Sequence, residues 1–354
     1  MKIVSIRAHR KQLALKKPYT ITRHTISDAE IVFFEIELAN GDVGLGSANT
    51  DTDVVNEDSL QTLANLQSDK VAELVGKDIR EFRSLIVSLN RSFSSFPGTM
   101  AAIDIALHDA FGKYLGISIL DFYGRAHKKM ITSVTVGIKG VEETLAEAEE
   151  YYRQGFKALK VKTGLDPEED AERIVMLRAK YDDHFVIRVD ANTGYSAAQL
   201  EQFINLTRYA DVELIEQPIL PGTEQELLEF PLEIRNRLAA DESLKNAGSA
   251  LSLVPERPFG IYNIKLMKCG GILAALDIAA IAREADISLF WGCNDESMVS
   301  ITAALHAAFA CPHTRYIDLD GSLDLAEDIV IDGFTLQDGF MIPNNRPGLG
   351  LTWI

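Results

Sequence analysis

Hydrophobic and polar residues follow two different patterns along this chain, and the pattern changes near residue 130. In the first part, three runs alternate between apolar and polar side chains as strands do, namely 2–10, 30–38 and 42–48. Asn40-Gly41, between the last two runs, is typical of a hairpin turn. Three later runs have apolar residues at helical spacing, at about 57–75, 79–91 and 99–115. The first 125 residues are therefore predicted to form an antiparallel sheet followed by helices.

From residue 130 onward, short runs rich in β-branched residues alternate with amphipathic stretches. Eight such runs are present, at 133–137, 158–162, 186–190, 212–216, 237–241, 262–265, 287–291 and 315–319. The polar residues that end them recur every 24 to 28 positions. One strand and one helix per roughly 25–30 residues, repeated eight times, is typical of a (β/α)8 barrel. A doubly wound open sheet is the alternative, but it often carries a glycine-rich phosphate loop, and neither G-x-G-x-x-G nor G-x-x-x-x-G-K-[ST] occurs here.

Composition narrows the class of protein. The 354 residues suffice for two domains, or for one large barrel and an addition. With 35 Lys and Arg against 52 Asp and Glu, the net charge of −17 argues against nucleic acid or an anionic membrane surface as the partner. Three cysteines without a C-x-x-C pair predict no disulfide framework, and no signal peptide or bilayer-spanning run is evident. We therefore expect a soluble, cytoplasmic protein.

Acidic residues end three consecutive strands of the predicted barrel: Asp190, Glu216 and Asp241. The carboxyl ends of barrel strands converge on one site, so these side chains are expected to lie close together. Any one of them could be an ordinary solvated residue at a strand end, but three in register with the repeat favour a shared purpose. Carboxylates brought together repel one another unless a cation lies between them, and a set of oxygen ligands favours Mg²⁺.

Three lysines accompany the carboxylates. Lys160 and Lys162 are two apart on a strand and therefore point to the same side, whereas Lys265 ends the sixth run, across the barrel. Burial and mutual repulsion are expected to lower the pKa of at least one lysine of the pair, as a general base requires. Lys268 is interpreted as a surface residue. A metal between two opposed bases suits removal of the proton α to a carboxylate and its return to the other face.

The sequence resembles the enolase superfamily, in its muconate-lactonizing subgroup and, within it, the dipeptide epimerases. The motifs that carry the resemblance are LKVK ending at Lys162, VDAN at 189–192, IEQP at 215–218, ADES at 240–243, NIKLMKCGGI at 263–272 and AIDIALHDAFGKYLG at 102–116. The resemblance implies that Asp190, Glu216 and Asp241 bind Mg²⁺. It implies further that Lys162 and Lys265 are the acid/base pair, acting through a metal-stabilised enediolate, and that Lys160 supports Lys162.

The same resemblance implies how the chain is divided. An α+β capping domain would comprise residues 1–125 and be completed by 325–354, over a modified barrel, (β/α)7β, formed by 126–324. The glycine- and proline-rich tail at 330–354, where the barrel pattern stops, agrees with a return to the N-terminal part. We expect a homo-oligomer whose partner is a small-molecule dipeptide.

Residues at the ends of the first and eighth strands are expected to bind the substrate. In YIDLD, the pair Asp318 and Asp320 resembles the clamp that dipeptide epimerases use for the substrate's α-ammonium. An ammonium needs acceptors and a counter-charge, which two carboxylates provide. Thr135 is interpreted either as a hydrogen-bond partner of the substrate backbone, as in the relatives, or as a packed β-branched residue.

Two loops bear on the preference for the substrate's side chain. Relatives selective for Ala-Glu carry an arginine where His24 aligns, and Arg23 lies one position off that register. Asp295, in the loop GCNDE, would repel a glutamate side chain. We therefore predict an Ala-Xaa epimerase whose second residue is small, hydrophobic or uncharged and polar. The alternatives are a cationic second residue attracted by Asp295, and an Ala-Glu epimerase in which Arg23 shifts into place.

Three other functions are weighed against this one. A cycloisomerase or o-succinylbenzoate synthase of the same superfamily would keep the fold but have no need of Asp318 and Asp320. A zinc hydrolase is disfavoured because the seven histidines contain no H-x-H or H-x-x-x-H pair. A barrel that only binds is disfavoured because all three carboxylates and all three lysines are present.

Overall fold

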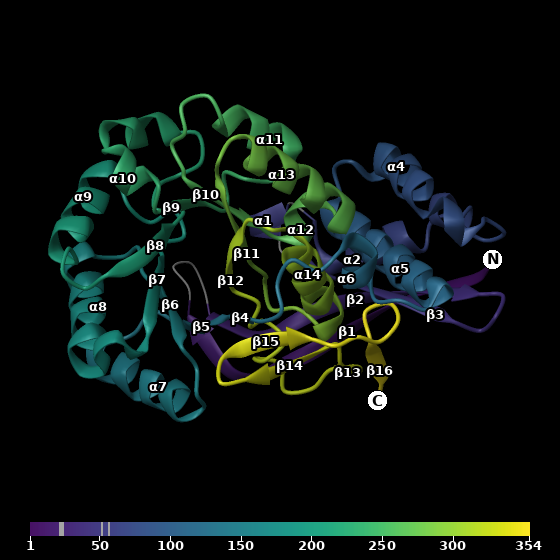
Figure 1. The fold of residues 1–354 in the computed structure, drawn as a ribbon, viewed down its shortest axis with the longest axis horizontal. Helices are drawn as coiled ribbons and strands as arrows, with labels where there is room; N and C mark the ends of the chain where they lie inside the picture. The colour runs from purple at the N-terminus through teal and green to yellow at the C-terminus, as the bar shows by residue number, and fades with distance from the viewer. Residues whose placement is uncertain (21–24, 51, 56) are drawn as a thin grey trace.

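An eight-stranded parallel sheet forms the centre of the computed structural model, which describes residues 1–20, 25–50, 52–55 and 57–354 (Figure 1). In spatial order its strands are β5 (Ser133–Val136), β6 (Ala158–Lys162), β7 (Val186–Asp190), β8 (Val212–Glu216), β9 (Leu238–Ala240), β10 (Ile261–Ile264), β11 (Ser288–Trp291) and β12 (Thr314–Ile317). A parallel bridge between Thr132 and Ile317 brings the first and last strands together, so the sheet nearly closes. All eight predicted runs contain strands, and the sheet is a barrel rather than the doubly wound alternative.

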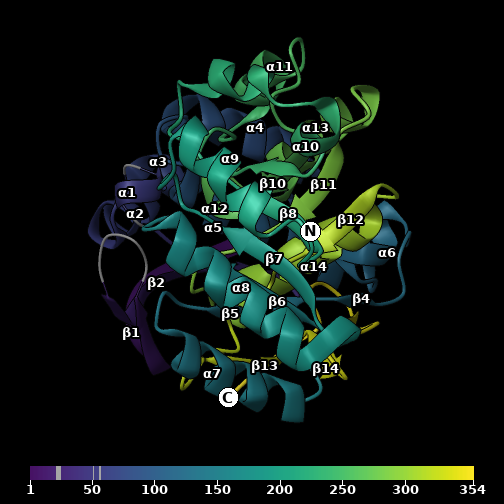
Figure 2. The same ribbon diagram turned by 90° about the vertical axis from the view of Figure 1, so that its left-hand side faces the viewer.

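Helices follow the strands and cover the outside of the barrel (Figure 1, Figure 2). They are α7 (Val141–Arg153), α8 (Pro167–Tyr181), α9 (Ala197–Leu206), α10 (Leu232–Arg235), α11 (Ala247–Leu253), the single turn α12 (Leu266–Cys269), α13 (Ile272–Glu284) and α14 (Met298–Ala310), with short 3-10 turns at Asp182–His184 and Glu224–Glu229. Local capping sets where these helices begin. Asp166 accepts backbone N–H bonds at the start of α8, and Ser196 forms a capping box at the start of α9.

The N-terminal part is an antiparallel sheet with helices packed on it. Its strands are β1 (Ile3–Thr20), β2 (Thr25–Leu38) and β3 (Val43–Asn49), paired in that order. Its helices are α1 (Thr52–Val55), α2 (Ser59–Leu66), α3 (Asp69–Ala72), α4 (Phe82–Phe93), α5 (Pro97–Leu115) and α6 (Ile119–Tyr123), with a 3-10 turn at Ile79–Glu81. The single helix predicted over 57–75 is wrong, because Ser68 takes an extended backbone as the N-cap of α3 and separates it from α2.

Helix α5 lies against β3 at very short range. A Cβ atom placed on Gly46 would lie 2.0 Å from the carbonyl oxygen of Ala102, so only glycine permits this approach. Most of α5 is buried, including Asp104, whose carboxylate accepts backbone N–H bonds from Ile272 and Leu273 at the start of α13. This carboxylate therefore joins the N-terminal part to the barrel helix that follows β10.

The C-terminal tail contacts both the barrel and the N-terminal part. It contains β13 (Val330–Asp332), β14 (Phe334–Gln337), β15 (Phe340–Pro343) and β16 (Leu351–Trp353). β15 pairs with β4 (Met130–Ile131), at the entrance to the barrel. Asp109 of α5 accepts the backbone N–H of Leu349, which attaches the tail to the N-terminal helices.

Two further observations concern the chain as a whole. Cys269, Cys293 and Cys311 are all free thiols, in agreement with the predicted lack of a disulfide framework. Over the ranges that the structure describes, every helix is either too short or too polar to cross a membrane.

Candidate active site

A cavity of about 480 Å³ lies at the carboxyl ends of the barrel strands. One side of its wall comes from residues 27–30 of β2 and from the segment after β3. The other side comes from the barrel and includes Thr135, Lys160, Lys162 and Lys265. A molecule bound here would therefore touch both the N-terminal part and the barrel.

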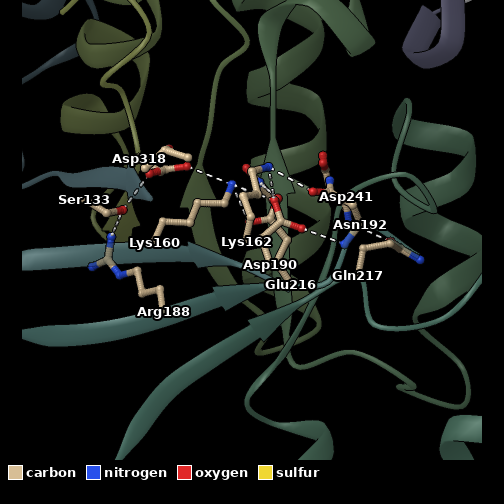
Figure 3. Close-up of polar contacts among 12 residues, drawn as sticks. Ser133, Lys160, Lys162, Arg188, Asp190, Asn192, Glu216, Gln217, Asp241 and Asp318 are labelled. Carbon is tan, nitrogen blue, oxygen red and sulfur yellow. Dashed lines mark hydrogen bonds and ion pairs between the residues drawn. The ribbon is translucent and has the colours of Figure 1, made fainter. Parts of the chain in front are cut away.

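The three predicted metal ligands lie together (Figure 3), and Asp241 among them lines this cavity. Asp190 and Glu216 are the last residues of β7 and β8 and lie opposite each other in the sheet register, and Asp241 directly follows β9. All three side chains are buried. Lys160 connects this group, because its Nζ lies 3.1 Å from Asp190 Oδ2 and 2.9 Å from Glu216 Oε2. The structure thus brings together the carboxylates and lysines that the sequence analysis singled out.

One oxygen of each carboxylate is held by the protein framework. The three bonds are from the Asn192 backbone N–H to Asp190 Oδ1 at 3.0 Å, from Asn263 Nδ2 to Glu216 Oε1 at 2.7 Å, and from Lys268 Nζ to Asp241 Oδ1. Each carboxylate is therefore fixed in rotation by a donor that is not one of the predicted acid/base lysines.

The second oxygen of each carboxylate faces a lysine that lines the cavity. The three contacts are Asp190 Oδ2 to Lys162 Nζ at 2.7 Å, Glu216 Oε2 to Lys160 Nζ at 2.9 Å, and Asp241 Oδ2 to Lys265 Nζ at 3.0 Å. Three carboxylate oxygens, at the ends of three neighbouring strands, thus face ammonium groups.

These three oxygens fit a hard divalent cation. Glu216 Oε2 is buried and, among the residues that the structure describes, accepts no hydrogen bond, although it contacts Lys160. Burial and the charge of Asp190 raise the pKa of Glu216 to about 8, because the neighbouring ammonium groups compensate its ionised form only in part. Within the described part of the chain, no three Asp, Glu, His or Cys groups lie close enough together to hold a metal ion as they stand. Lysine ammonium groups contact the three carboxylate oxygens instead. A cation would take over the neutralising role of the ammonium groups.

The lysines differ from the sequence expectation in their electrostatics. Burial lowers the pKa of Lys160, but the ion pairs with Asp190, Asp318 and Glu216 outweigh burial and raise this pKa well above the usual range. For Lys160, the lowered pKa expected from the lysine pair is therefore wrong. Lys265 likewise has its pKa raised, because Asp241 outweighs the effect of burial. Neighbouring carboxylates, which the spacing of two lysines does not reveal, decide the direction.

Lys268 is buried, so its interpretation as a surface residue is wrong. Lys265 is the N-cap of α12, and Lys268 lies three residues further on, within the same single turn. Residues three apart in a helix lie on one face, so both ammonium groups reach Asp241. The K-x-x-K spacing directly after a strand is the signal that could have identified Lys268.

Asp318 and Asp320 follow β12 and are both buried. Asp318 Oδ1 accepts a hydrogen bond from Ser133 Oγ at 2.6 Å, and its Oδ2 accepts one from Lys160 Nζ at 2.9 Å. Asp320 Oδ2 accepts the backbone N–H of Thr135 at 2.8 Å. Both oxygens of Asp318 are thus engaged by the barrel, whereas Asp320 Oδ1 lies 4.0 Å from the Cys293 thiol.

Two polar residues that were not predicted from the sequence support this part of the site. Arg188 of β7 is buried and donates to Ser133 Oγ at 3.1 Å and to the Ile317 carbonyl at 2.6 Å (Figure 3). Asn192 accepts a hydrogen bond from Lys162 Nζ at 3.0 Å through its side-chain oxygen. An arginine inside the run VIRVD and the asparagine of VDAN are the signals that could have marked them.

The predicted substrate-binding residues are only partly brought together. Thr135 and Asp295 line the cavity, as do Asp318 and Asp320. His24 and Arg23 lie outside the described residues. Five further carboxylates that the sequence analysis did not single out also line the cavity: Asp28, Glu30, Asp58, Glu242 and Asp324.

Negative charge accumulates on this wall. Burial and the charge of Asp295 raise the pKa of Asp324 to about 7, and burial and the charge of Asp241 raise that of Glu242 to about 7. Glu242 Oε2 is buried and has no hydrogen-bond partner within the described ranges. A raised pKa means that the ionised carboxylate lacks full compensation of its charge. A positively charged group placed among these carboxylates would therefore be favoured.

Comparisons with known proteins were made against families, characterised proteins and solved structures. A family model described as "Mandelate racemase / muconate lactonizing enzyme, N-terminal domain" matches residues 3–124, and one described as "Enolase C-terminal domain-like" matches 143–354. The chain is 48% identical to an L-Lys-D/L-Arg epimerase of Desulforapulum autotrophicum, over 99% of each protein. It is 45% identical to an L-Lys-D/L-Arg epimerase of Methylococcus capsulatus, over 100% of this chain and 99% of that protein.

Solved structures agree with these sequence matches. A dipeptide epimerase from Methylococcus capsulatus, complexed with Mg and the dipeptide L-Arg-D-Lys, superposes with a TM-score of 0.98 at 45% identity, covering 100% of both chains. A dipeptide epimerase from Enterococcus faecalis, complexed with Mg and L-Leu-L-Tyr, superposes with a TM-score of 0.93 at 29% identity, over 99% of this chain and 100% of that one. Similarity thus extends across the N-terminal part, the barrel and the tail together.

Proposed function

This chain belongs to the enolase superfamily, among its dipeptide epimerases, and from that premise we propose that it inverts the α-carbon of the C-terminal residue of cationic dipeptides, with Mg²⁺ as cofactor. The comparisons give no support to the predicted preference for a small or uncharged residue after alanine. Relatives named for lysine and arginine, at 48% and 45% identity, favour the cationic alternative instead.

The charge of the cavity wall is the observation that carries the proposed substrate class. Three lysines line the cavity, and each is ion-paired with carboxylates at its floor. Among the residues that the structure describes, nine acidic ones line it: Asp28, Glu30, Asp58, Asp241, Glu242, Asp295, Asp318, Asp320 and Asp324. A dipeptide with two cationic side chains would offset this excess, whereas a glutamate side chain would add to it.

The barrel geometry supports proton transfer on opposite faces of the substrate. Lys162 ends β6 and Lys265 follows β10, and these strands are four places apart in a ring of eight. One lysine can therefore remove the α-proton while the other delivers a proton from the opposite side, which inverts the centre. When bound, Mg²⁺ would supply a Lewis acid that polarises the substrate carboxylate and makes the α-proton more acidic.

The roles of the remaining residues follow from their contacts. We assign Asp190, Glu216 and Asp241 to the cation, through the oxygens that now face lysines. Lys160 neutralises the carboxylates between which it lies and keeps them in place for Lys162. For the substrate's α-ammonium we assign Asp318 and Asp320, with Thr135 beside them. Asp295 would contribute to the choice of side chain.

The division of the chain is part of the same proposal. Residues 1–125 with 325–354 would form a cap that selects the dipeptide, and 126–324 the barrel that carries the chemistry. The bond from the Leu349 N–H to Asp109 supports the assignment of the tail to the cap, and the pairing of β15 with β4 places the tail where the cap meets the barrel.

Hydrogen exchange at the substrate α-carbon tests the proposal. Purified protein with Mg²⁺ in D₂O would be incubated with Lys-Arg, Ala-Val and Ala-Glu, and deuterium incorporation followed by mass spectrometry. We expect incorporation of one deuterium in the C-terminal residue of Lys-Arg, fastest of the three, and its loss when EDTA removes the metal. Equal or faster exchange in Ala-Val or Ala-Glu would overturn the cationic substrate class, and no exchange in any dipeptide would overturn the epimerase itself.

A further inference from the structure

Lys268 is a buried cation that stands apart from the acid/base lysines. It belongs to α12 and is only 5% exposed. Its Nζ donates to three oxygens: the Asp241 carbonyl at 2.5 Å, Asp241 Oδ1, and the Asn263 carbonyl at 3.2 Å. An ammonium has three N–H donors, so all of them are in use. Lys268 therefore has no donor left for a substrate in the large cavity, which it does not line within the described chain.

Two lysines each contact a different oxygen of the Asp241 carboxylate. Lys265 lies 3.0 Å from Oδ2 and lines the large cavity, whereas Lys268 holds Oδ1 from the other side. Lys268 instead borders a second, smaller cavity of about 220 Å³ behind the site. The carboxylate plane is thus set so that one oxygen faces the proposed cation site and the other faces away from it.

The backbone of Asp241 is fixed at both of its polar groups. Its N–H donates to Gln217 Oε1 at 2.9 Å, and its carbonyl accepts from Lys268. A turn of the side chain would break the bond between Oδ1 and Lys268 as well as the contact between Oδ2 and Lys265. Because Lys268 also holds the Asp241 carbonyl, it is the contact that couples the rotamer of Asp241 to its own backbone.

The same segment of chain supports a second carboxylate. Asn263 of β10 donates from its side chain to Glu216 Oε1 at 2.7 Å, while its carbonyl accepts from Lys268. Strand β10 and the turn after it thus orient two of the three carboxylates assigned to the cation, in addition to carrying Lys265. This arrangement makes Lys268 a part of the support for the site rather than of its chemistry.

We propose that Lys268 is a positioning residue that holds Asp241 with one oxygen turned toward the cation site and thereby sets the affinity of the chain for Mg²⁺. This inference rests on the cofactor of the proposed function and not on its substrate class. Loss of a partner behind a metal ligand typically weakens metal affinity 10–100-fold. A role of Lys268 through charge alone has the opposite sign, because removal of a positive charge beside a cation site would strengthen cation binding.

The test is the dissociation constant of Mg²⁺, measured by titration calorimetry on the full chain without substrate. We expect Lys268→Met to raise this constant about 10–100-fold. The matched control is Lys245→Met, the same chemical change at an exposed lysine that borders the same smaller cavity, and it should leave the constant unchanged. Metal-free thermal unfolding in EDTA shows whether each variant is folded. A folded Lys268→Met that binds Mg²⁺ as tightly as the wild type, or more tightly, would overturn the proposal.

A second variant covers the case in which Lys268→Met does not fold. Lys268→Arg keeps the buried charge, but its planar guanidinium cannot place donors where the compact ammonium has them. We expect weaker Mg²⁺ binding than in the wild type, and unchanged binding in this variant would contradict a positioning role. A wild type that binds no Mg²⁺ would instead overturn the proposed cofactor, which separates the two failures.

Discussion

Removal of the Lys160 ammonium should destabilise the fold more than removal of any surface lysine. The perturbation is Lys160→Met, which keeps most of the side-chain length but removes the charge. Lys160 is 3% exposed and lies within 2.9 to 3.1 Å of Asp190, Glu216 and Asp318. The variant would leave buried carboxylate oxygens without their counter-charge.

The expected cost follows from the burial of these groups. Breaking a buried ion pair by removing one partner costs about 3–5 kcal/mol, because the remaining charge is uncompensated. Since one ammonium serves three carboxylates here, we expect a loss of at least about 4 kcal/mol in the free energy of unfolding without metal. Mg²⁺ should restore part of this loss, since at 100 times its dissociation constant a ligand of the folded state adds about 2.7 kcal/mol.

Urea unfolding in EDTA, followed by circular dichroism and tryptophan fluorescence, measures this difference. The matched control is Lys70→Met, whose ammonium lies 2.8 Å from Glu73 with both side chains exposed. An exposed pair of this kind contributes about 0–1 kcal/mol, so the control should unfold close to the wild type. If Lys160→Met also unfolded within about 1 kcal/mol of the wild type, the carboxylates would not depend on Lys160, and the electrostatic reasoning would be refuted.

Three further outcomes are expected. Lys162→Ala and Lys265→Ala should each abolish α-proton exchange from one epimer of the dipeptide while sparing the other more, and equal losses from both epimers in D₂O would contradict the assignment of opposed bases. Asp318→Asn and Asp320→Asn should lower kcat/KM for free dipeptides by at least about 30-fold, as loss of a buried charge partner costs about 2–5 kcal/mol; kcat/KM assays that find both variants as active as the wild type would favour a substrate without an ammonium. Burial lowers the pKa of His306 to about 3 from 6.5, so its protonation in the unfolded state should remove about 2 kcal/mol of stability between pH 7 and pH 5. Urea unfolding at the two pH values should show a loss about 2 kcal/mol larger in the wild type than in His306→Leu, and equal changes in both would contradict it.

Much of the barrel could be predicted because its signals are local. Each strand is a short β-branched run, each of α8 and α9 begins at a cap, and the repeat of 24 to 28 residues is visible in the chain itself. The break in the predicted helix at 57–75 was missed because the weak signal of Ser68 competes with continuous apolar spacing. Helix propensity along the chain cannot decide whether this stretch forms one helix or two.

The sequence was enough to predict which residues share the site. It was not enough to predict which of these residues are paired with one another. Strand ends in register converge in any barrel, so the spacing of Asp190, Glu216 and Asp241 was enough to predict their proximity. The burial of Lys268 and the engagement of Asp318 by Lys160 depend on contacts between strands far apart in the chain. A pKa responds to every charge within a few ångströms, and so the direction of its shift for Lys160 required the tertiary structure.

Substrate selectivity shows most clearly the difference between what the sequence determines and what the tertiary structure decides. The sequence by itself determined the fold class, the candidate cation ligands and the candidate acid/base lysines, because motifs at strand ends carry that information. Only the folded chain gathered carboxylates from β2, from α2's N-cap Asp58 and from the loop holding Asp324 onto one cavity wall. None of these carboxylates stands out in the linear sequence, since an isolated acidic residue is most often solvated. Their combined field exists only once distant segments enclose a shared volume of low dielectric, where like charges reinforce one another.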